Sequence, residues 1–439
     1  GGAQSGWGKQ IMGRWLDAVA VYRDPRMALI GVLGFSSGLP LALSFGTLSA
    51  WLASTGIDRT TIGLFALMGL PYALKFLWSP LIDGLKIPIL TRRLGRRRSW
   101  MVTSQLLLFP TIIALGLTNP VTDIGHTALL ALMVAFLSAT QDIVIDAYRV
   151  EILAAREQGA GAAAVQLGYR VGMLVSGAGA LYIADAFGWP AAYSVMGLGM
   201  GVGLLAILLS SEPKQSAAYL KKESRQTNLN RWMADHVVAP FADFLKRPGW
   251  MAVLLFIVLY KFGDAVAGVM ANTFFVSIGF SLSAIASVTK VFGIGATLIG
   301  AVAGGVVVLR YGLFPALLWC GGLQMLSNLM FAVQASVGAD MGLLALTVGI
   351  ENISGGMGTA AFVAYLSRLC HFDFTATQYA LFSSLAAVGR TVLSSGGGWL
   401  AERLDWFWFF VTSAVCAVPG LLILLWMMRR PEMFDSEAD

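Results

Sequence analysis

The chain has 439 residues, of which 57% are hydrophobic and only 12% are charged, and its formal net charge is +6. A soluble globular protein carries about 25% charged residues, and an apolar run of about 18 or more residues is typical of a membrane span. Such runs recur along the whole sequence, so the composition excludes a soluble protein and indicates a polytopic membrane protein.

The first 26 residues precede the first long apolar run and are expected to form a tail in the cytoplasm. Five apolar side chains would share one face of a helix over residues 7–22, namely Trp7, Ile11, Trp15, Leu16 and Val19. This pattern favours an amphipathic helix at the membrane surface, although an unstructured tail fits almost as well.

Twelve apolar segments follow, and we predict that each crosses the membrane as a helix. Their ranges are 27–53, 60–83, 99–118, 126–148, 158–185, 189–210, 248–277, 284–309, 313–335, 341–369, 375–401 and 406–428. Of the Lys and Arg residues assigned to the connections and tails, 23 fall on one side of the membrane and 2 on the other. The positive-inside rule therefore places both ends of the chain in the cytoplasm.

A long polar and basic linker, residues 211–247, divides these segments into two sets of six. The predicted fold is an all-α membrane protein with two pseudo-symmetric six-helix halves, residues 27–210 and 248–428, and a cytoplasmic tail at 429–439. Arg170 and Arg390 support a duplication, because they lie 220 residues apart, follow a glycine by one or two residues, and precede stretches of small residues.

Nine ionisable side chains lie inside the apolar segments, although each costs roughly 2.5–3.5 kcal/mol to insert at a helix centre. They are Lys75, Asp142, Asp146, Arg170, Lys261, Asp264, Lys290, Glu351 and Arg390. When the segments are grouped in threes, the acids occur in first helices, the second helix of every triplet carries one base, and third helices carry no charge. We therefore expect first and second helices to line a polar pathway and third helices to face lipid. The first segment lacks a charge, but Gly38 and Pro40 predict a helix break whose free backbone groups water or a substrate could satisfy.

The acids are candidates for proton coupling. Asp142 and Asp146 share one face of the fourth segment, and their repulsion favours a proton on one of them. Pairing of Asp146 with Arg149 at the membrane surface is an equally good alternative. Lys261 and Asp264 are three residues apart, so a self-neutralising structural pair is also possible. The predicted proton-coupling residues are Asp142, Asp264, Glu351 and Asp146.

Five bases against four acids favour an anionic or zwitterionic substrate, whose carboxylates Lys and Arg would bind. The predicted substrate-binding residues are Lys261, Lys290, Arg170 and Arg390 for carboxylates, with Gln141, Asn272 and Asn352 for amides or hydroxyls. Gly355, Gly356 and Gly358 follow Glu351 by one turn, and they leave room either for close helix packing or for a bulky ligand.

An acid at the end of the second segment, Asp83, precedes an arginine cluster that opens the third, Arg96, Arg97 and Arg98. Such an arrangement can form a latch that one conformation makes and another breaks, and Lys75 is assigned to the same latch. The pattern resembles a loop motif of the major facilitator superfamily, with longer spacing. A basic loop that only sets topology would explain the arginines but not Asp83.

Longer stretches resemble the AmpG-type muropeptide permeases of that superfamily. They are residues 34–52, 75–83, 95–100, 138–148, 159–177, 258–265, 351–366 and 374–390, which contain eight of the nine charges but not Lys290. The resemblance implies proton-coupled import of anhydromuropeptides, fragments of peptidoglycan, across the bacterial inner membrane, in cell-wall recycling and β-lactamase induction. It implies a functional monomer among membrane lipids, with protons as the coupling ion, no other cofactor and no nucleic-acid partner.

Two other functions are less well supported by the residues. A proton-coupled facilitator for other anionic or zwitterionic peptides or for drugs is the first, although five bases within the membrane argue against a drug exporter. A membrane-embedded enzyme is the second, but the three histidines lie at segment edges or in a loop and no HExxH or GxSxG motif occurs. We therefore expect neither catalysis nor a metal site.

Overall fold

The computed structural model describes residues 20–57, 61, 65–213, 238–280, 282–394 and 396–430, and every regular element within them is a helix. Most of the predicted amphipathic helix, most of the linker and the C-terminal tail lie outside the described residues. The side chains of two predicted substrate-binding residues, Asn272 and Lys290, also lie outside the described part of the chain.

The first half of the chain contains the elements η1 (Val21–Arg23), α2 (Pro25–Ser44), α3 (Gly46–Ser54), η2 (Phe65–Gly69), α5 (Leu70–Leu74), η3 (Lys75–Leu77), α6 (Ser79–Gly84), α7 (Leu90–Leu94), α8 (Arg96–Gly116), α9 (Ile124–Ile152), η4 (Ala155–Glu157), α10 (Gln158–Leu174), η5 (Val175–Gly179), α11 (Ala180–Phe187) and α12 (Trp189–Leu209). The second half contains α15 (Ala239–Leu245), α16 (Trp250–Leu259), α17 (Phe262–Ser277), α18 (Leu282–Ile285), η7 (Ala286–Phe292), α19 (Gly293–Tyr311), α20 (Leu313–Val337), α21 (Met341–Arg368), η8 (Phe372–Phe374), α22 (Thr375–Ser394), α23 (Gly397–Arg403), α24 (Trp406–Val415) and α25 (Val418–Met428).

Nine helices in the described part of the chain are long and apolar enough to cross a membrane. They correspond to nine of the twelve predicted segments. The second, tenth and eleventh predicted segments contain α5 to α6, α21 and α22 to α23, so helix occupies all twelve ranges. The number twelve itself stays a prediction.

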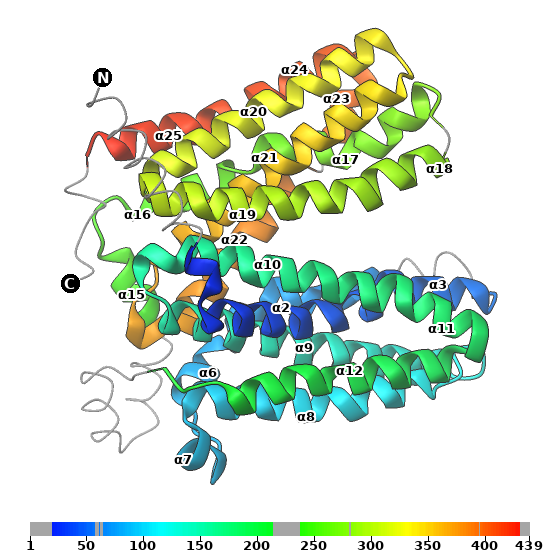
Figure 1. Ribbon diagram of the computed structural model, residues 1–439, viewed down its shortest axis with the longest axis vertical. Coiled ribbons are helices and arrows are strands. Elements are labelled where there is room, and N and C mark those ends of the chain that lie inside the picture. Colours follow the sequence, from blue (N-terminus) through cyan, green and yellow to red (C-terminus); the bar gives the residue numbers. More distant parts are fainter. Residues whose placement is uncertain are drawn as a thin grey trace, which may run out of the picture.

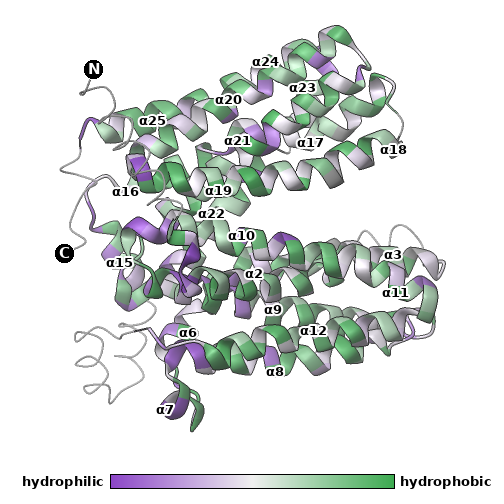
Figure 2. Cartoon of the chain, in the orientation of Figure 1, coloured by the Kyte–Doolittle hydropathy of each residue, from purple (hydrophilic) through white to green (hydrophobic). Residues whose placement is uncertain are grey.

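The helices form two groups, α2 to α12 and α16 to α25, which lie close together at the end that carries both chain termini and diverge toward the other end (Figure 1). Across this boundary, α10 contacts α19 and α21, and α22 contacts α9 and α6. Hydrophobic residues cover most of the helix surfaces, whereas many hydrophilic residues gather around α6, α7 and α15 at the terminal end (Figure 2). The core consists of several apolar clusters. The one around Tyr193 lies within the first group, whereas the one around Phe256 lies mainly in the second group and includes Val150 of α9.

Helix ends follow from local sequence. At the end opposite the termini, aspartates cap α9, α21 and α24: Asp123, Asp340 and Asp405 accept a backbone N–H two or three residues into the helix. Gly188 and Gly312 have positive φ and occupy the one-residue turns between α11 and α12 and between α19 and α20.

The predicted helix break at Gly38 and Pro40 is wrong, because α2 runs without interruption from Pro25 to Ser44, and the discontinuity before α3 falls at Phe45. Gly38 has a different purpose. A Cβ at this position would lie 2.1 Å from the backbone oxygen of Tyr169, so glycine lets α2 and α10 approach closely. A real discontinuity falls in the seventh predicted segment, where α16 ends at Leu259 and α17 begins at Phe262. This places Lys261 at a helix start rather than within a continuous helix.

Replacing Gly168 by Ala is expected to destabilise the α2–α10 contact by about 1–3 kcal/mol, the usual range for overpacking a close contact. Its added Cβ would lie 1.7 Å from the backbone oxygen of Gly31, which cannot move aside as a side chain can. The measurement is thermal unfolding in detergent. Gly177→Ala, on the same predicted span but with open space around the new Cβ, is the control and should leave the midpoint unchanged. Equal midpoints for both variants would contradict the packing argument.

Candidate functional site

Two acids of α9, Asp142 and Asp146, interact with Lys75 of η3. Asp146 lies 3.8 Å from Lys75 Nζ and 4.0 Å from Arg149 Nη2. Asp142, one turn earlier, accepts a hydrogen bond from Ser37 Oγ of α2 and has no salt-bridge partner within the described part of the chain. Lys75 thus belongs to this acidic group and not to the arginine cluster, where the sequence had placed it.

A second group lies in the other half. Lys261 Nζ is 3.4 Å from Asp264 Oδ2, donates to Gln324 Oε1 at 2.9 Å and reaches the Gly355 carbonyl at 3.4 Å. These three acceptors match the three N–H donors of a lysine ammonium. Gly358 leaves room for the Gln324 amide, since a Cβ at this glycine would lie 2.4 Å from Gln324 Oε1. Gln324 lies on α20, a third helix of the predicted triplets, and sequence analysis missed it because only charges were followed.

Glu351 and Asn352 join this second group from α21. Asn352 Nδ2 donates to Glu351 Oε2 at 2.7 Å, and Asn352 Oδ1 accepts from Thr297 Oγ1 of α19 at 2.7 Å. Glu351 interacts electrostatically with both Asp264 and Lys261. The predicted residues of the seventh and tenth segments are therefore brought together.

Arg170 and Arg390, one from each half, have no hydrogen-bond or ion-pair partner among the described residues. Arg390 is exposed and Arg170 is half-buried. The charges of both arginines act on the Tyr169 hydroxyl, as do those of Asp142 and Asp146, and Arg390 also acts on Lys261. The two acid–base groups and the two arginines thus form one electrostatic neighbourhood that crosses the boundary between the halves.

Gln141 takes a different place from the one predicted. Its side chain has no exposed surface, and its Nε2 donates to the Ser36 carbonyl of α2 at 2.8 Å. In this conformation Gln141 connects α2 to α9 within the first half and does not face the arginines.

The predicted latch joins the two halves near the chain termini. Asp83 Oδ1 pairs with Arg97 Nη2 at 2.8 Å, while its Oδ2 accepts from the backbone N and Oγ1 of Thr377, at the start of α22, at 2.8 and 2.7 Å. Arg97 also pairs with Glu151, and so does Arg96, at 3.3 Å. Sequence analysis missed Glu151 and Thr377.

Arg98 binds elsewhere, because it donates to the carbonyls of Ile207 and Leu208 at the end of α12. Glu212, just beyond that helix, accepts the backbone N–H groups of Arg97 and Arg98 and so caps α8 from outside its own segment. Burial raises the pKa of the Glu212 carboxyl, and these two N–H donors oppose the increase. Arg149 adds a further contact between the halves, since it donates to Ser367 Oγ of α21 at 3.0 Å.

Replacing Asp83 by Asn is expected to weaken the closure of this end, because it removes the anion from a buried pair with Arg97. Cys370, close to Asp83 and Arg149, reports on opening. We expect its maleimide labelling rate to rise about tenfold or more, the effect of roughly 1.4 kcal/mol on the closed population. The background carries Cys320→Ala and Cys416→Ala.

Thr377→Val removes one of the two donors to Asp83 and should have a smaller effect in the same direction. Asp340→Asn, at the opposite end, serves as the control, because Asp340 caps α21 by accepting the backbone N–H of Leu343. Unchanged labelling in Asp83→Asn would show that this aspartate does not hold the halves together.

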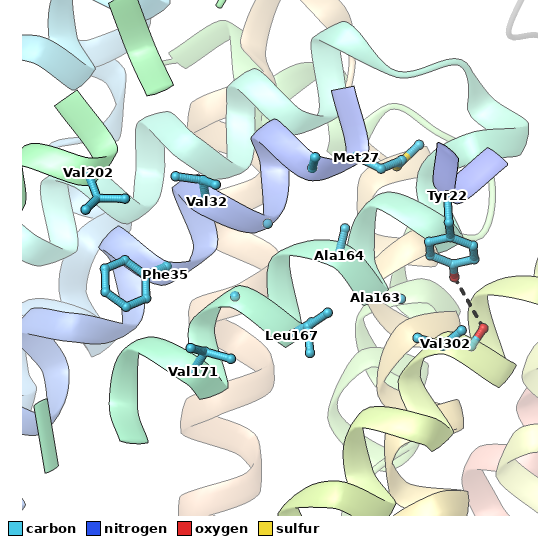
Figure 3. Close-up of a pocket in the computed structure, with 13 residues that line it drawn as sticks. Tyr22, Met27, Val32, Phe35, Ala163, Ala164, Leu167, Val171, Val202 and Val302 are labelled. Atoms are coloured by element: carbon cyan, nitrogen blue, oxygen red, sulfur yellow. Dashed lines mark hydrogen bonds between the residues drawn. The ribbon is translucent and has the colours of Figure 1, made fainter. Parts of the chain in front are cut away.

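A separate cavity of about 520 Å³ lies along the seam of α2 and α10 (Figure 3). Its walls are apolar side chains such as Phe35, Leu167 and Val202, and its polar feature is Tyr22, whose hydroxyl donates to the Val302 carbonyl. None of the eight intramembrane charges whose side chains the structure describes lines it. This cavity is therefore not the candidate site.

Comparison with known proteins gives a consistent result. The family model described as "Major Facilitator Superfamily" matches residues 30–389. The anhydromuropeptide permease of Escherichia coli K12 is 43% identical over 407 residues, which cover 92% of this chain and 80% of that protein. A putative AmpG transporter of Rickettsia felis is 34% identical over 412 residues, 93% of this chain and 98% of that protein.

Solved structures share the fold at low identity. The fucose:proton symporter FucP in the outward conformation superposes with a TM-score of 0.67 at 12% identity, covering 92% of this chain and 99% of that one. The proton:xylose symporter XylE gives a TM-score of 0.64 at 15% identity, covering 95% and 96%.

Proposed function

Since this chain belongs to the major facilitator superfamily and to the family of anhydromuropeptide permeases, we propose that it imports anhydromuropeptides by proton-coupled alternating access. It is a multi-pass protein of the bacterial inner membrane, a carrier and not an enzyme. In the cell this transport would return peptidoglycan fragments to the cytoplasm for wall recycling and for induction of β-lactamase.

The observation that carries the substrate assignment is a pair of arginines, Arg170 and Arg390, for which the described part of the chain provides no hydrogen-bond or ion-pair partner. A muropeptide offers several peptide carboxylates, and a guanidinium binds a carboxylate with two parallel hydrogen bonds. One arginine comes from each half, so a substrate bound to both would bridge the boundary at which the halves move. Lys261 is already saturated by its three acceptors in this conformation and is not the first contact.

Proton uptake then changes the pairs beside the substrate. A proton on Asp264 removes the charge that faces Lys261 and releases that ammonium for a substrate carboxylate. Glu351 is the next acid within electrostatic reach. A proton on Asp142 ends the charge-assisted bond from Ser37, which links α2 to α9. Protonation is thereby coupled to the packing of both halves.

Alternating access requires one end to open as the other closes. Asp83, Arg97 and Thr377 close the end near the termini. If both termini are cytoplasmic, as the distribution of basic residues predicts, this conformation faces the periplasm and is ready to receive substrate. We propose that one chain forms one carrier, without a cofactor other than the proton.

The test is uptake of radiolabelled anhydromuropeptide by proteoliposomes that contain the purified protein, with an inward proton gradient imposed. We expect accumulation that a protonophore collapses. A muropeptide with amidated carboxylates is the matched control and should compete poorly. No uptake, or uptake that ignores the gradient, would contradict the proposal. Stronger competition by unrelated anionic peptides would instead favour a broader peptide carrier.

A further inference from the structure

A group of buried polar side chains lies beside Asp142, where α2, α8, α9 and α12 contact one another. Ser36, Gln105 and Gln141, here called the buried amide cluster, expose no more than 2% of their surface. Four of their side-chain atoms have no hydrogen-bond partner within the described part of the chain: Ser36 Oγ, Gln105 Oε1, Gln105 Nε2 and Gln141 Oε1. Gln105 lies on a third helix that was expected to face lipid.

Gly203 of α12 makes room for two polar atoms of the cluster, which pack directly against its backbone. A Cβ at this glycine would lie 1.9 Å from Ser36 Oγ and 2.4 Å from Gln105 Nε2. These two polar atoms therefore lie close enough together for one water molecule to bridge them. Gln141 lies beside them, because its Nε2 donates to the carbonyl of Ser36 itself.

Buried polar atoms are rarely left without partners, since more than about 90% of them are paired with protein or ordered water in native structures. A buried water makes about three hydrogen bonds to such groups and needs a polar space to do so. The amide of Gln105 can both donate and accept, the Gln141 carbonyl can accept, and the Ser36 hydroxyl can do either. The cluster thus has the composition of a water site.

We propose that ordered water occupies the buried amide cluster and, through Ser36 and Gln141, fixes the geometry in which Asp142 exchanges its proton. This inference rests on the proposed proton coupling. Gln105 is then a positioning residue, because it acts on Asp142 through others and does not touch it.

The connection to Asp142 runs through two adjacent pairs. Ser36 and Ser37 of α2 bind Gln141 and Asp142 of α9, one through a backbone carbonyl and the other through a hydroxyl. Water that holds Ser36 and Gln141 in place therefore holds the donor to the Asp142 carboxylate. The ionisable groups that act on or are acted on by Asp142 are Asp146 of α9, Lys75 of η3, Tyr72 of α5 and Tyr169 of α10. None belongs to α8 or α12, so a change at Gln105 or Gly203 leaves this charge set intact.

The experiment measures the pH profile of gradient-free substrate exchange in proteoliposomes for Gln105→Leu and Gly203→Ala. Gln105→Leu removes the amide, whereas Gly203→Ala adds a methyl group where Ser36 Oγ and Gln105 Nε2 pack against the glycine, so it displaces both atoms but keeps every polar side chain. Both loosen the donor to the carboxylate, which then holds its proton more tightly. We expect the midpoint of the pH profile to move upward by up to about one pH unit, which is equivalent to a tenfold change in proton affinity.

Gly201→Ala is the matched control for Gly203→Ala, since its Cβ meets open space on the same helix. Gln334→Leu is the control for Gln105→Leu, because Gln334 is buried on α20 and has partners for both amide atoms. Both controls should keep the wild-type midpoint, even where the yield of folded protein falls.

A cryo-EM map of the wild-type protein in nanodiscs, at a resolution that shows ordered water, should contain a peak between Ser36 and Gln105 that Gly203→Ala removes. Wild-type midpoints in both variants, or a map without the peak, would overturn the inference while transport by the wild type still supports the proposed function. Absence of transport by the wild type would overturn the proposed function first. If Gln105→Leu does not fold, Gly203→Ala alone decides.

Discussion

Asp142→Asn is expected to abolish proton-driven accumulation of substrate while substrate exchange across the membrane continues. One proton that crosses a potential of 100 mV supplies about 2.3 kcal/mol, which sustains roughly 50-fold accumulation when one proton moves with each substrate. The variant should reach a concentration ratio of about one. Asparagine keeps an acceptor for Ser37 Oγ and nearly the same shape, so binding and the conformational cycle remain.

Asp142 is preferred over Asp264 and Asp146 for a geometric reason, which it shares with Glu351 of α21. Asp264 and Asp146 each have a basic nitrogen within 4.0 Å, whereas Asp142 has none among the described residues. A carboxylate without a cation beside it, in a site with little water, is the one that gains most from a proton. Accumulation and counterflow are both measured with radiolabelled substrate in proteoliposomes.

Asp185→Asn serves as the control, because Asp185 lies exposed on α11, remote from the charged group. It should accumulate substrate like the wild type. Gradient-driven accumulation by Asp142→Asn with an unchanged pH dependence would transfer the coupling role to Asp264 or Glu351, for which the same substitution to the amide provides the next test.

The sequence predicted the helical segments well, because length and apolar composition alone decide whether a segment can cross a membrane. It could not predict where those helices are irregular. The π-helical turn at Val175–Gly179 and the discontinuity at Tyr260–Lys261 lie inside apolar runs, and neither contains a proline. The expected break at Gly38 and Pro40 was wrong for the opposite reason: small residues that pack two helices together resemble residues that break one.

The candidate site was predicted in part, because charge inside a membrane is a strong signal and neutral polarity is a weak one. Asp83 and Arg97 were found as a pair, but Thr377, which joins Asp83 to the other half, looks like any threonine at a helix start. Gln324 and Gln105 were missed because third helices were judged by their lack of charge. Counting buried amides as well as charges would have identified both glutamines.

Arg170→Gln and Arg390→Gln are each expected to weaken substrate binding about 10- to 100-fold, the effect of losing hydrogen bonds to a charged group worth about 1.5–3 kcal/mol. Glutamine keeps length and polarity but lacks the charge and the forked donors that match a carboxylate. Lysine should restore the charge without the second hydrogen bond and give an intermediate affinity. Dissociation constants are measured by isothermal titration calorimetry in detergent. Arg403→Gln, whose guanidinium lies over the Trp399 ring at 4.0 Å, should bind like the wild type.

A second ligand distinguishes substrate recognition by the two arginines from a role of these arginines in maintaining the structure. If the two arginines bind carboxylates, a muropeptide with amidated carboxylates should bind weakly to the wild type and equally weakly to both variants. If the two guanidinium groups share one carboxylate, the double variant should lose less binding free energy than the sum of the two single losses. If each guanidinium binds its own carboxylate, the double variant should lose the full sum. An equal loss of affinity for the amidated and the free ligand would mean that the arginines maintain the boundary between the halves. In that case the substrate carboxylates must be bound by Lys261 after a proton on Asp264 has released it, so protonation would have to precede tight binding.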